Sequence, residues 1–260
     1  MAISNNDEYK VNMGPAWELI TAFERMLNGI GEIEVEDIFL KTIALQSCKS
    51  HPRTALHRLL YYFAYQIYYS DDMDWAHSDE DEVNWYKYLA SYMGVKISKQ
   101  CKNINTVSNI LNDKVFRQGL NRFVDSAFAV LWNNKKLLYK FNLLLAEKVK
   151  TCKKKDHPKI LSKDGVIARA NQSSWPQWVK KQILYRDRGY CQYCYRQVSS
   201  IDMLNDVYDI DHMVPLEQGG TYDPTNLILS CRPCNRSKGK KYKPVEDVFC
   251  WPKKPDFKRI

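Results

Sequence analysis

The chain has 260 residues, of which 45% are hydrophobic and 27% are charged, a composition typical of a globular protein with one large domain or two modest ones. It contains no apolar run of about 18 residues and no basic-then-apolar leader, so we expect neither a membrane span nor a secretory signal, and we expect a cytoplasmic protein. The net charge is +9, and residues 1–150 hold 18 of the 39 basic and 18 of the 30 acidic side chains, so the whole excess lies in residues 151–260. A basic surface confined to one part of the chain predicts a polyphosphate partner, such as nucleic acid, for that part; basic surface that serves only solubility is the alternative.

The first part of the chain, from about residue 15 to residue 148, is expected to form five to seven helices. Apolar side chains recur there at three- and four-residue spacing, beginning with Trp17, Ile20 and Phe23. Residues 54–69 are apolar nearly all round, which predicts the central helix of a bundle. The acidic stretch at residues 71–82 is expected to be a solvated loop, with contact to a basic partner as the alternative. We therefore predict a helical domain over residues 1–150 that binds the target or a partner protein.

The tyrosines of the central helix allow two interpretations. At helical spacing on an apolar segment they are expected to pack in the core and at its rim, and stacking on nucleic-acid bases is the alternative. These side chains are Tyr61, Tyr62, Tyr65, Tyr68 and Tyr69.

Residues 151–174 are expected to be a basic linker. The run Lys153–Lys155 is interpreted as a solvated tether, with contact to phosphates as the alternative. Ser174 is then a candidate cap for a helix that carries Trp175 in its first turn and ends at Gly189. Two short strands, residues 207–211 and 227–230, precede a helix that begins near residue 231, and residues 246–260 are expected to form a tail.

Four cysteines occur as two Cys-x-x-Cys pairs, one at Cys191 and Cys194 and the other at Cys231 and Cys234. Each pair offers two thiolates from a tight turn, and four thiolates complete a tetrahedral Zn²⁺ site. Such a closed site holds structure and leaves no position for a substrate. Any chemistry must therefore come from the residues that the zinc holds together, namely Asp211, His212, Asn226 and Asn235.

The order of these elements resembles the HNH endonucleases, also called ββα-metal or His-Me finger nucleases. The resemblance covers roughly residues 178–241 and rests on both cysteine pairs, Asp211-His212-x-x-Pro215, Gly219-Gly220, Asn226-Leu227 and Asn235-x-x-Lys238. It implies a mainly α chain with a small α+β module: a helical N-terminal domain followed by a zinc-stapled ββα-metal HNH domain at residues 175–245. It also implies a metal-dependent endonuclease that hydrolyses phosphodiester bonds in DNA, with RNA not excluded.

His212 is the candidate general base, because an imidazole titrates near neutrality and can take a proton from water. The resemblance implies that Asp211 and Asn235 hold the catalytic metal, and the hard amide oxygen of asparagine favours Mg²⁺ or Mn²⁺. It also implies that Asn226 makes a hydrogen bond that fixes the loop and orients His212. Asp209 faces the same way as Asp211 on a regular strand and is a further candidate acid. The candidate phosphate-binding residues are Lys238, Arg232 and Arg236.

Two other functions compete with this hypothesis. The first is a zinc-stabilised nucleic-acid-binding module without catalysis. The second is a nuclease subunit whose helical domain docks a partner protein, which the zero net charge of residues 1–150 favours. A restriction enzyme, an anti-phage nuclease and a mobile-element nuclease all fit the sequence.

Overall fold

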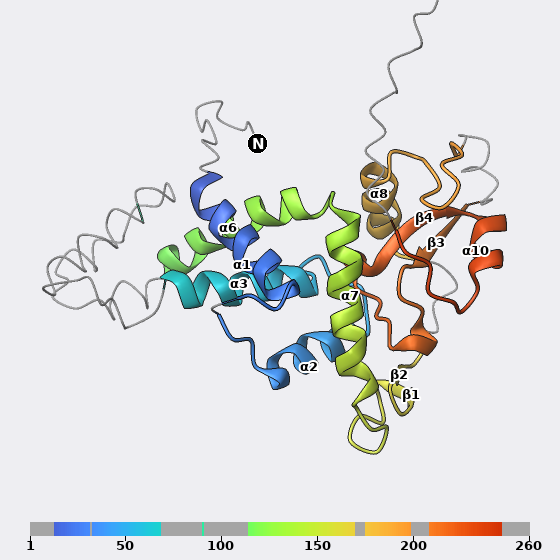
Figure 1. The fold of residues 1–260 in the computed structure, drawn as a ribbon, viewed down its shortest axis with the longest axis horizontal. Coiled ribbons are helices and arrows are strands. Elements are labelled where there is room, and N and C mark those ends of the chain that lie inside the picture. Colours follow the sequence, from blue (N-terminus) through green and yellow to red (C-terminus); the bar gives the residue numbers. More distant parts are fainter. Residues whose placement is uncertain are drawn as a thin grey trace, which may run out of the picture. The chain divides into compact units, whose positions relative to one another are not determined.

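A computed structural model describes residues 13–31, 33–68, 90, 114–169, 175–198 and 208–245 (Figure 1). The chain divides into two compact units, residues 1–39 with 52–131 and residues 40–51 with 132–260. The predicted boundaries at residues 150, 174 and 245 stay predictions. The acidic stretch 71–82 and the predicted tail 246–260 lie outside the described residues.

Three helices make up the described core of the first unit: α1 (Met13–Leu27), α3 (Ala55–Tyr68) and α6 (Lys114–Leu131). All three pack on one another, as Figure 1 shows in blue, cyan and green. The apolar spacing read from the sequence explains this packing, because the buried side chains fall on one face of each helix. They include Leu19, Phe23, Leu56, Leu59, Phe63, Leu120 and Phe123. A fourth helix, α2 (Asp37–Gln46), contains the point at which the two units divide.

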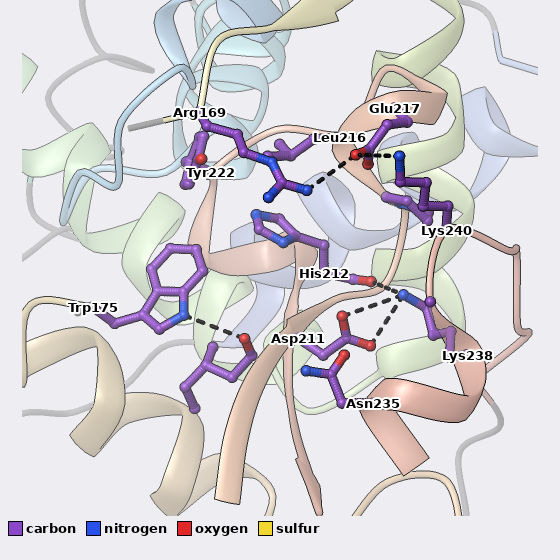
Figure 2. Close-up of a pocket in the computed structure, with 13 residues that line it drawn as sticks. Arg169, Trp175, Asp211, His212, Leu216, Glu217, Tyr222, Asn235, Lys238 and Lys240 are labelled. Atoms are coloured by element: carbon purple, nitrogen blue, oxygen red, sulfur yellow. Dashed lines mark hydrogen bonds and ion pairs between the residues drawn. The ribbon is translucent and has the colours of Figure 1, made fainter. Parts of the chain in front are cut away.

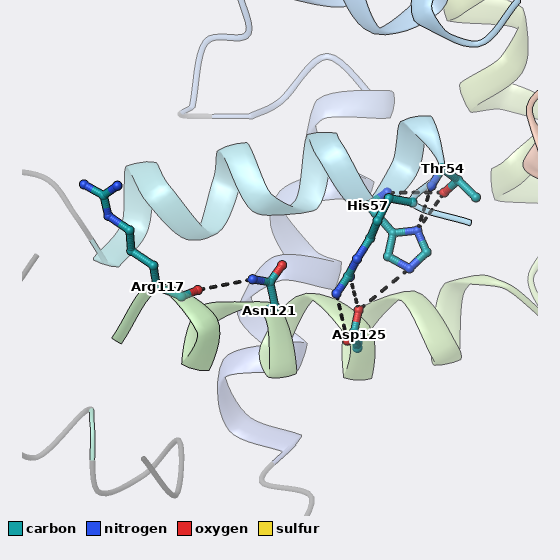
Figure 3. Close-up of polar contacts among 6 residues, drawn as sticks. Thr54, His57, Arg117, Asn121 and Asp125 are labelled. Atoms are coloured by element: carbon teal, nitrogen blue, oxygen red, sulfur yellow. Dashed lines mark hydrogen bonds and ion pairs between the residues drawn. The ribbon is translucent and has the colours of Figure 1, made fainter. Parts of the chain in front are cut away.

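A histidine is held neutral near the start of α3 (Figure 3). The backbone N–H of Thr54 donates to His57 Nδ1 at 3.1 Å, and the imidazole stacks on Phe128 with ring centroids 3.7 Å apart. Its Nε2 lies 3.8 Å from Asp125, which also forms an ion pair with Arg53. Burial and the Arg53 charge lower the pKa of His57 to about 4, against the opposing effect of Asp125. The ring therefore belongs to the packed core of the first unit.

The second unit contains a ββα arrangement. Strands β3 (Tyr208–His212) and β4 (Leu227–Cys231) are antiparallel, with Asp211 opposite Ile228 and His212 opposite Leu227. Helix α10 (Arg232–Lys238) follows β4 directly and packs on both strands, while α8 (Gln177–Arg186) packs on β4 (Figure 1). The shared core consists of Val179, Ile183, Val198, Ile210, Leu227 and Leu229. The predicted mainly α fold with a small α+β module is confirmed.

The loop between β3 and β4 is held against α7 (Lys135–Lys150). It contains two short 3₁₀ turns, η2 (Leu216–Gln218) and η3 (Pro224–Asn226). Two glycines permit its path: a Cβ on Gly219 would lie 2.6 Å from the carbonyl oxygen of Ala146, and one on Gly220 would lie 1.9 Å from that of Val214. The pair is part of the HNH pattern seen in the sequence, and the structure shows that close backbone approach requires glycine at both positions.

Two local predictions differ from the structure. Helix α8 begins at Gln177, so Trp175 precedes the helix and does not lie in its first turn, and Pro176 occupies the cap position without a side-chain bond. Ser174, the predicted cap, lies outside the described residues. The segment predicted as a linker contains a hairpin, β1 (Leu161–Lys163) and β2 (Val166–Ile167). Across the described part of the chain, no helix has both the length and the apolar character needed to span a bilayer.

Candidate functional site

Four cysteines converge where the loop after α8 meets the junction of β4 and α10. The sulfur atoms of Cys191, Cys194, Cys231 and Cys234 all lie within 4.8 Å of one another, and those of Cys194 and Cys231 are 3.8 Å apart. A tetrahedral ion with Zn–S bonds of about 2.3 Å places its ligand sulfurs about 3.8 Å apart, so this cluster fits a structural zinc. Burial opposes ionisation of Cys191, but N–H groups at Cys231, Cys194 and Tyr193 outweigh it and lower the pKa of the Cys191 thiol to about 7.

A pocket of about 620 Å³ opens beside the end of β3 (Figure 2). Four predicted site residues line it: Asp211 and His212 from β3, and Asn235 and Lys238 from α10. Neighbouring side chains on a regular strand point to opposite faces, but β3 ends at His212, so both residues reach one pocket. The chain thus brings a carboxylate, an imidazole and an amide to a single cavity.

The Asp211 carboxylate is buried and contacts two donors. Lys238 Nζ lies 3.0 Å from one of its oxygens and also donates to the backbone oxygen of His212 at 2.7 Å. The hydroxyl of Tyr193 donates to Asp211 at 2.8 Å. Burial raises the pKa of Asp211, and Lys238 and Tyr193 oppose that rise. The carboxylate is therefore paired with one buried ammonium and one phenol hydroxyl.

The imidazole of His212 lies among aromatic rings. Its centroid is 5.3 Å from that of Trp175 and 5.2 Å from that of Tyr222, and its Nε2 is buried without a hydrogen-bond partner among the described residues. Burial and the positive charges of Lys238 and Arg169 lower the pKa of His212 to about 3. The ring is therefore neutral at physiological pH, with one nitrogen uncommitted.

Asn235 is oriented by a second acid of β3. Its Nδ2 donates to Asp209 at 3.0 Å, and this bond fixes the orientation of the amide. The Oδ1 atom takes no part in that bond. Figure 2 shows that oxygen on the side of Asp211. Asp209 also lies 3.9 Å from Arg232, so its observed partners are Asn235 and a cation.

Asn226 is fully buried and holds the loop that follows His212. Its Oδ1 accepts from the Val214 N–H at 2.9 Å, and its Nδ2 donates to the carbonyls of Val214 and Thr221 at 3.0 and 2.9 Å. The Met213 N–H donates to the Asn226 carbonyl at 2.7 Å. These bonds tie the residues directly after His212 to the start of β4, so Asn226 acts on the site through the backbone.

The three predicted phosphate-binding cations lie in different surroundings. Lys238 is buried against Asp211, Arg232 is partly exposed near Asp209, and Arg236 is exposed in the last turn of α10. Their role toward phosphate stays a prediction. The pocket wall also contains Arg169 and Lys240, both paired with Glu217, which sequence analysis did not single out.

Sequence analysis also missed a buried ion pair that joins α8 to β4. Arg186 Nε donates to Asp187 at 2.8 Å, and Asp187 accepts from the Leu229 N–H at 2.7 Å. The Arg186 guanidinium lies 4.5 Å from the centre of the Trp132 ring. The sequence signal was the charged run Arg186-Asp187-Arg188 ahead of Gly189, a pattern that is also common at exposed helix ends.

The HNH endonuclease family model matches residues 191–241, which contain the four cysteines and most of the pocket. Comparisons with curated proteins and with solved structures gave no significant match. The match confirms the resemblance seen in the sequence and supports a nuclease-type function and a nucleic-acid substrate at the level of the family. Residues 191–241 of this chain therefore match the HNH endonuclease model, and they contain a four-cysteine cluster suited to a metal such as zinc.

Proposed function

We propose that this chain is a metal-dependent HNH endonuclease that hydrolyses phosphodiester bonds in DNA. The observation that carries the proposal is the single pocket lined by Asp211, His212 and Asn235, beside a cysteine cluster at the position that the HNH model matches. The concentration of positive charge in residues 151–260 fits a polyanionic substrate. Without those three residues in one cavity, the cluster and the charge would support nucleic-acid binding only.

Asp211 and Asn235 are the residues that would hold a divalent cation. A carboxylate and an amide oxygen are hard ligands, suited to Mg²⁺ or Mn²⁺, and the amide of Asn235 is already oriented by Asp209. When bound, such a cation stabilises charge on the phosphate and on the leaving oxygen. In the free protein the Lys238 ammonium forms an ion pair with Asp211. A divalent cation at that carboxylate would repel the ammonium toward the phosphate oxygens of the substrate.

His212 acts as the base that takes a proton from the attacking water. A neutral imidazole with an uncommitted nitrogen is in the protonation state that this role requires. The negative charge of a phosphodiester in the pocket raises the pKa of the ring, which favours proton uptake when substrate is bound. The contacts of Trp175 and Tyr222 hold the ring orientation, since no hydrogen bond to Nε2 does so.

Plasmid nicking with Mg²⁺ or Mn²⁺ tests this proposal. We expect His212→Ala to lose at least about 100-fold in cleavage rate, the size typical of a general base, while zinc content and thermal unfolding stay unchanged. His157→Ala is the matched control, because His157 belongs to the same unit but does not line the pocket. Retention of the full rate by His212→Ala would exclude this mechanism. Duplex binding without cleavage, by wild type in either metal, would favour the non-catalytic binding module.

A protein-docking role for the first unit is the alternative that a specific observation favours. Trp17 and Ile30 are 53% and 67% exposed there, and the residues of that unit hold 11 basic and 17 acidic side chains, so the unit has no excess positive charge to attract DNA. A nuclease subunit of this kind would depend on its partner for target choice. Sequence-selective cleavage by the purified chain alone would contradict it, and loss of a co-purifying protein in Trp17→Ser would support it.

A further inference from the structure

A second group of charges lines the pocket beyond His212. Arg169, from the segment after β2, lies 3.0 Å from a Glu217 oxygen, and Lys240, from the segment after α10, lies 3.4 Å from the same oxygen. Glu217 belongs to η2. The side chains of Arg169 and Lys240 are 76% and 72% exposed, whereas that of Glu217 is 25% exposed. Figure 2 shows the Arg169 guanidinium between the His212 ring and Glu217.

The arrangement has the form of an anion site that is filled by the protein itself. Two cations from separate elements converge on one carboxylate oxygen, at the rim of the cavity that contains the candidate base. Arg169, Glu217 and Lys240 line the same pocket as His212, so the group lies in the cavity of the imidazole. Exposed ion pairs of this kind are weak, so a competing anion can displace the carboxylate at little cost.

We propose that Arg169 and Lys240 form a phosphate clamp, and that the Glu217 carboxylate occupies the place of a substrate phosphate in the free protein. This inference rests on the proposed function, because it assigns a backbone phosphate of the nucleic acid to that position. It adds two phosphate contacts to those expected from the sequence, and one of them, Arg169, lies outside the segment that the HNH model matches. It also gives Glu217 a defined role, as an internal competitor of the substrate.

The clamp predicts changes of opposite sign. Glu217→Gln removes the competitor and leaves both cations in place, so duplex binding should tighten about two- to fivefold. Arg169→Gln removes a phosphate contact, so binding should weaken and the slope of log K against log salt should become shallower by about 0.9. A merely structural role for the three residues predicts weaker binding in every variant, because each substitution would loosen the same pocket wall.

The measurement is fluorescence anisotropy with a short random-sequence DNA duplex, at several salt concentrations, on the full chain carrying His212→Ala to prevent cleavage. Lys153 and Asp164 supply the matched controls, since this exposed ion pair of 3.6 Å belongs to the same unit and does not line the pocket. Asp164→Asn and Lys153→Gln make the same charge changes as Glu217→Gln and Arg169→Gln. Thermal unfolding of each variant checks that the fold is kept.

Tighter binding in Glu217→Gln, beyond the change in Asp164→Asn, together with a shallower slope in Arg169→Gln, would support the clamp. If Asp164→Asn and Lys153→Gln change DNA binding as much as Glu217→Gln and Arg169→Gln do, the effect comes from net charge and the clamp is refuted. Weaker binding in Glu217→Gln would also refute the clamp. The nicking assay is read separately. Loss of cleavage in His212→Ala with no specific effect at Glu217 would refute the clamp alone, and a clamp in a chain that never cleaves would refute the nuclease alone.

Discussion

Asn226 offers the sharpest test of how the loop supports the site. Replacing it with alanine removes three side-chain hydrogen bonds, one from the Val214 N–H and two to the carbonyls of Val214 and Thr221. Asn226, Val214 and Thr221 are all buried, so water does not readily replace the lost partner. The residues released are the ones that follow His212 directly, and the expected effect therefore combines lower stability with lower activity.

The magnitude follows from the groups left without a partner. One N–H and two carbonyl acceptors lose a bond, and each buried polar group left unpaired costs about 1–3 kcal/mol. Because neighbouring losses are not additive, we expect a total of about 3–5 kcal/mol, a large share of a typical domain stability of about 5–15 kcal/mol. Asn142→Ala is the matched control: Asn142 is buried in the same unit, and its Nδ2 donates to Leu138 and Thr225. The Leu138 carbonyl lies within α7 and keeps its helical bond, so we expect a loss of about 1–2 kcal/mol there.

Urea unfolding followed by tryptophan fluorescence measures the stability difference, and hydrogen exchange of the Met213 and Val214 amides measures the local effect. In Asn226→Ala both amides should exchange faster, and plasmid nicking should fall by about 10- to 100-fold, the range typical of residues that support a metal site. Equal stability losses in Asn226→Ala and Asn142→Ala, or unchanged exchange at Val214, would refute the argument that this amide holds the loop.

Three other predictions concern backbone packing, metal and pH. Gly220→Ala should destabilise the chain by about 3 kcal/mol or more in urea unfolding, because its Cβ would lie 1.9 Å from the Val214 carbonyl oxygen. Gly29→Ala is the control: its Cβ would meet no atom within 4 Å, so the substitution should cost only about 1–2 kcal/mol for the left-handed backbone at that position. Cys234→Ser should reduce bound zinc from one ion per chain to almost none and lower the unfolding temperature; a full zinc content by atomic emission would contradict the cluster. His57 has a pKa lowered from 6.5 to about 4, so the unfolded chain takes up its proton first as pH falls. Stability should therefore decrease as pH drops from about 6.5 toward 4, by at most about 3 kcal/mol from this residue, and His57→Gln should show a correspondingly shallower pH dependence.

The parts of the site that the sequence revealed are those fixed by short spacing. Two thiolates three residues apart, an Asp-His pair at a strand end and an Asn next to Cys234 each depend on local geometry, so their clustering could be expected from order along the chain. The same holds for the helices of the first unit, whose apolar spacing alone predicts which faces are buried. A short sequence pattern was therefore sufficient wherever a single turn, strand or helix contains all the residues concerned.

The remaining features depend on contacts between distant segments. Ser47 donates to Asp223, 176 residues away, and Asn142 donates to Thr225, 83 residues away, and both bonds hold the loop over the pocket. No spacing rule links such positions. The contacts of Tyr193 and Lys238 with Asp211 could not be predicted for the same reason. Lys238 was a candidate for binding phosphate, but only the fold buries it against Asp211, and only the fold brings the tyrosine of the first Cys-x-x-Cys turn to the same carboxylate.

The cysteine cluster and the pocket share helix α10, and this makes the position of pocket residues depend on residues that do not line the pocket. Cys231 is the last residue of β4, opposite Tyr208 of β3, and Cys234 lies in the first turn of α10. Asn235 follows Cys234 directly, and Lys238 lies one turn further along the same short helix. A helix of seven residues is too short to be stable by itself, so its position comes from its two anchors, the cluster at one end and the Lys238 contact with Asp211 at the other. A bound ion at the thiolates therefore fixes the direction in which the Asn235 amide faces the pocket.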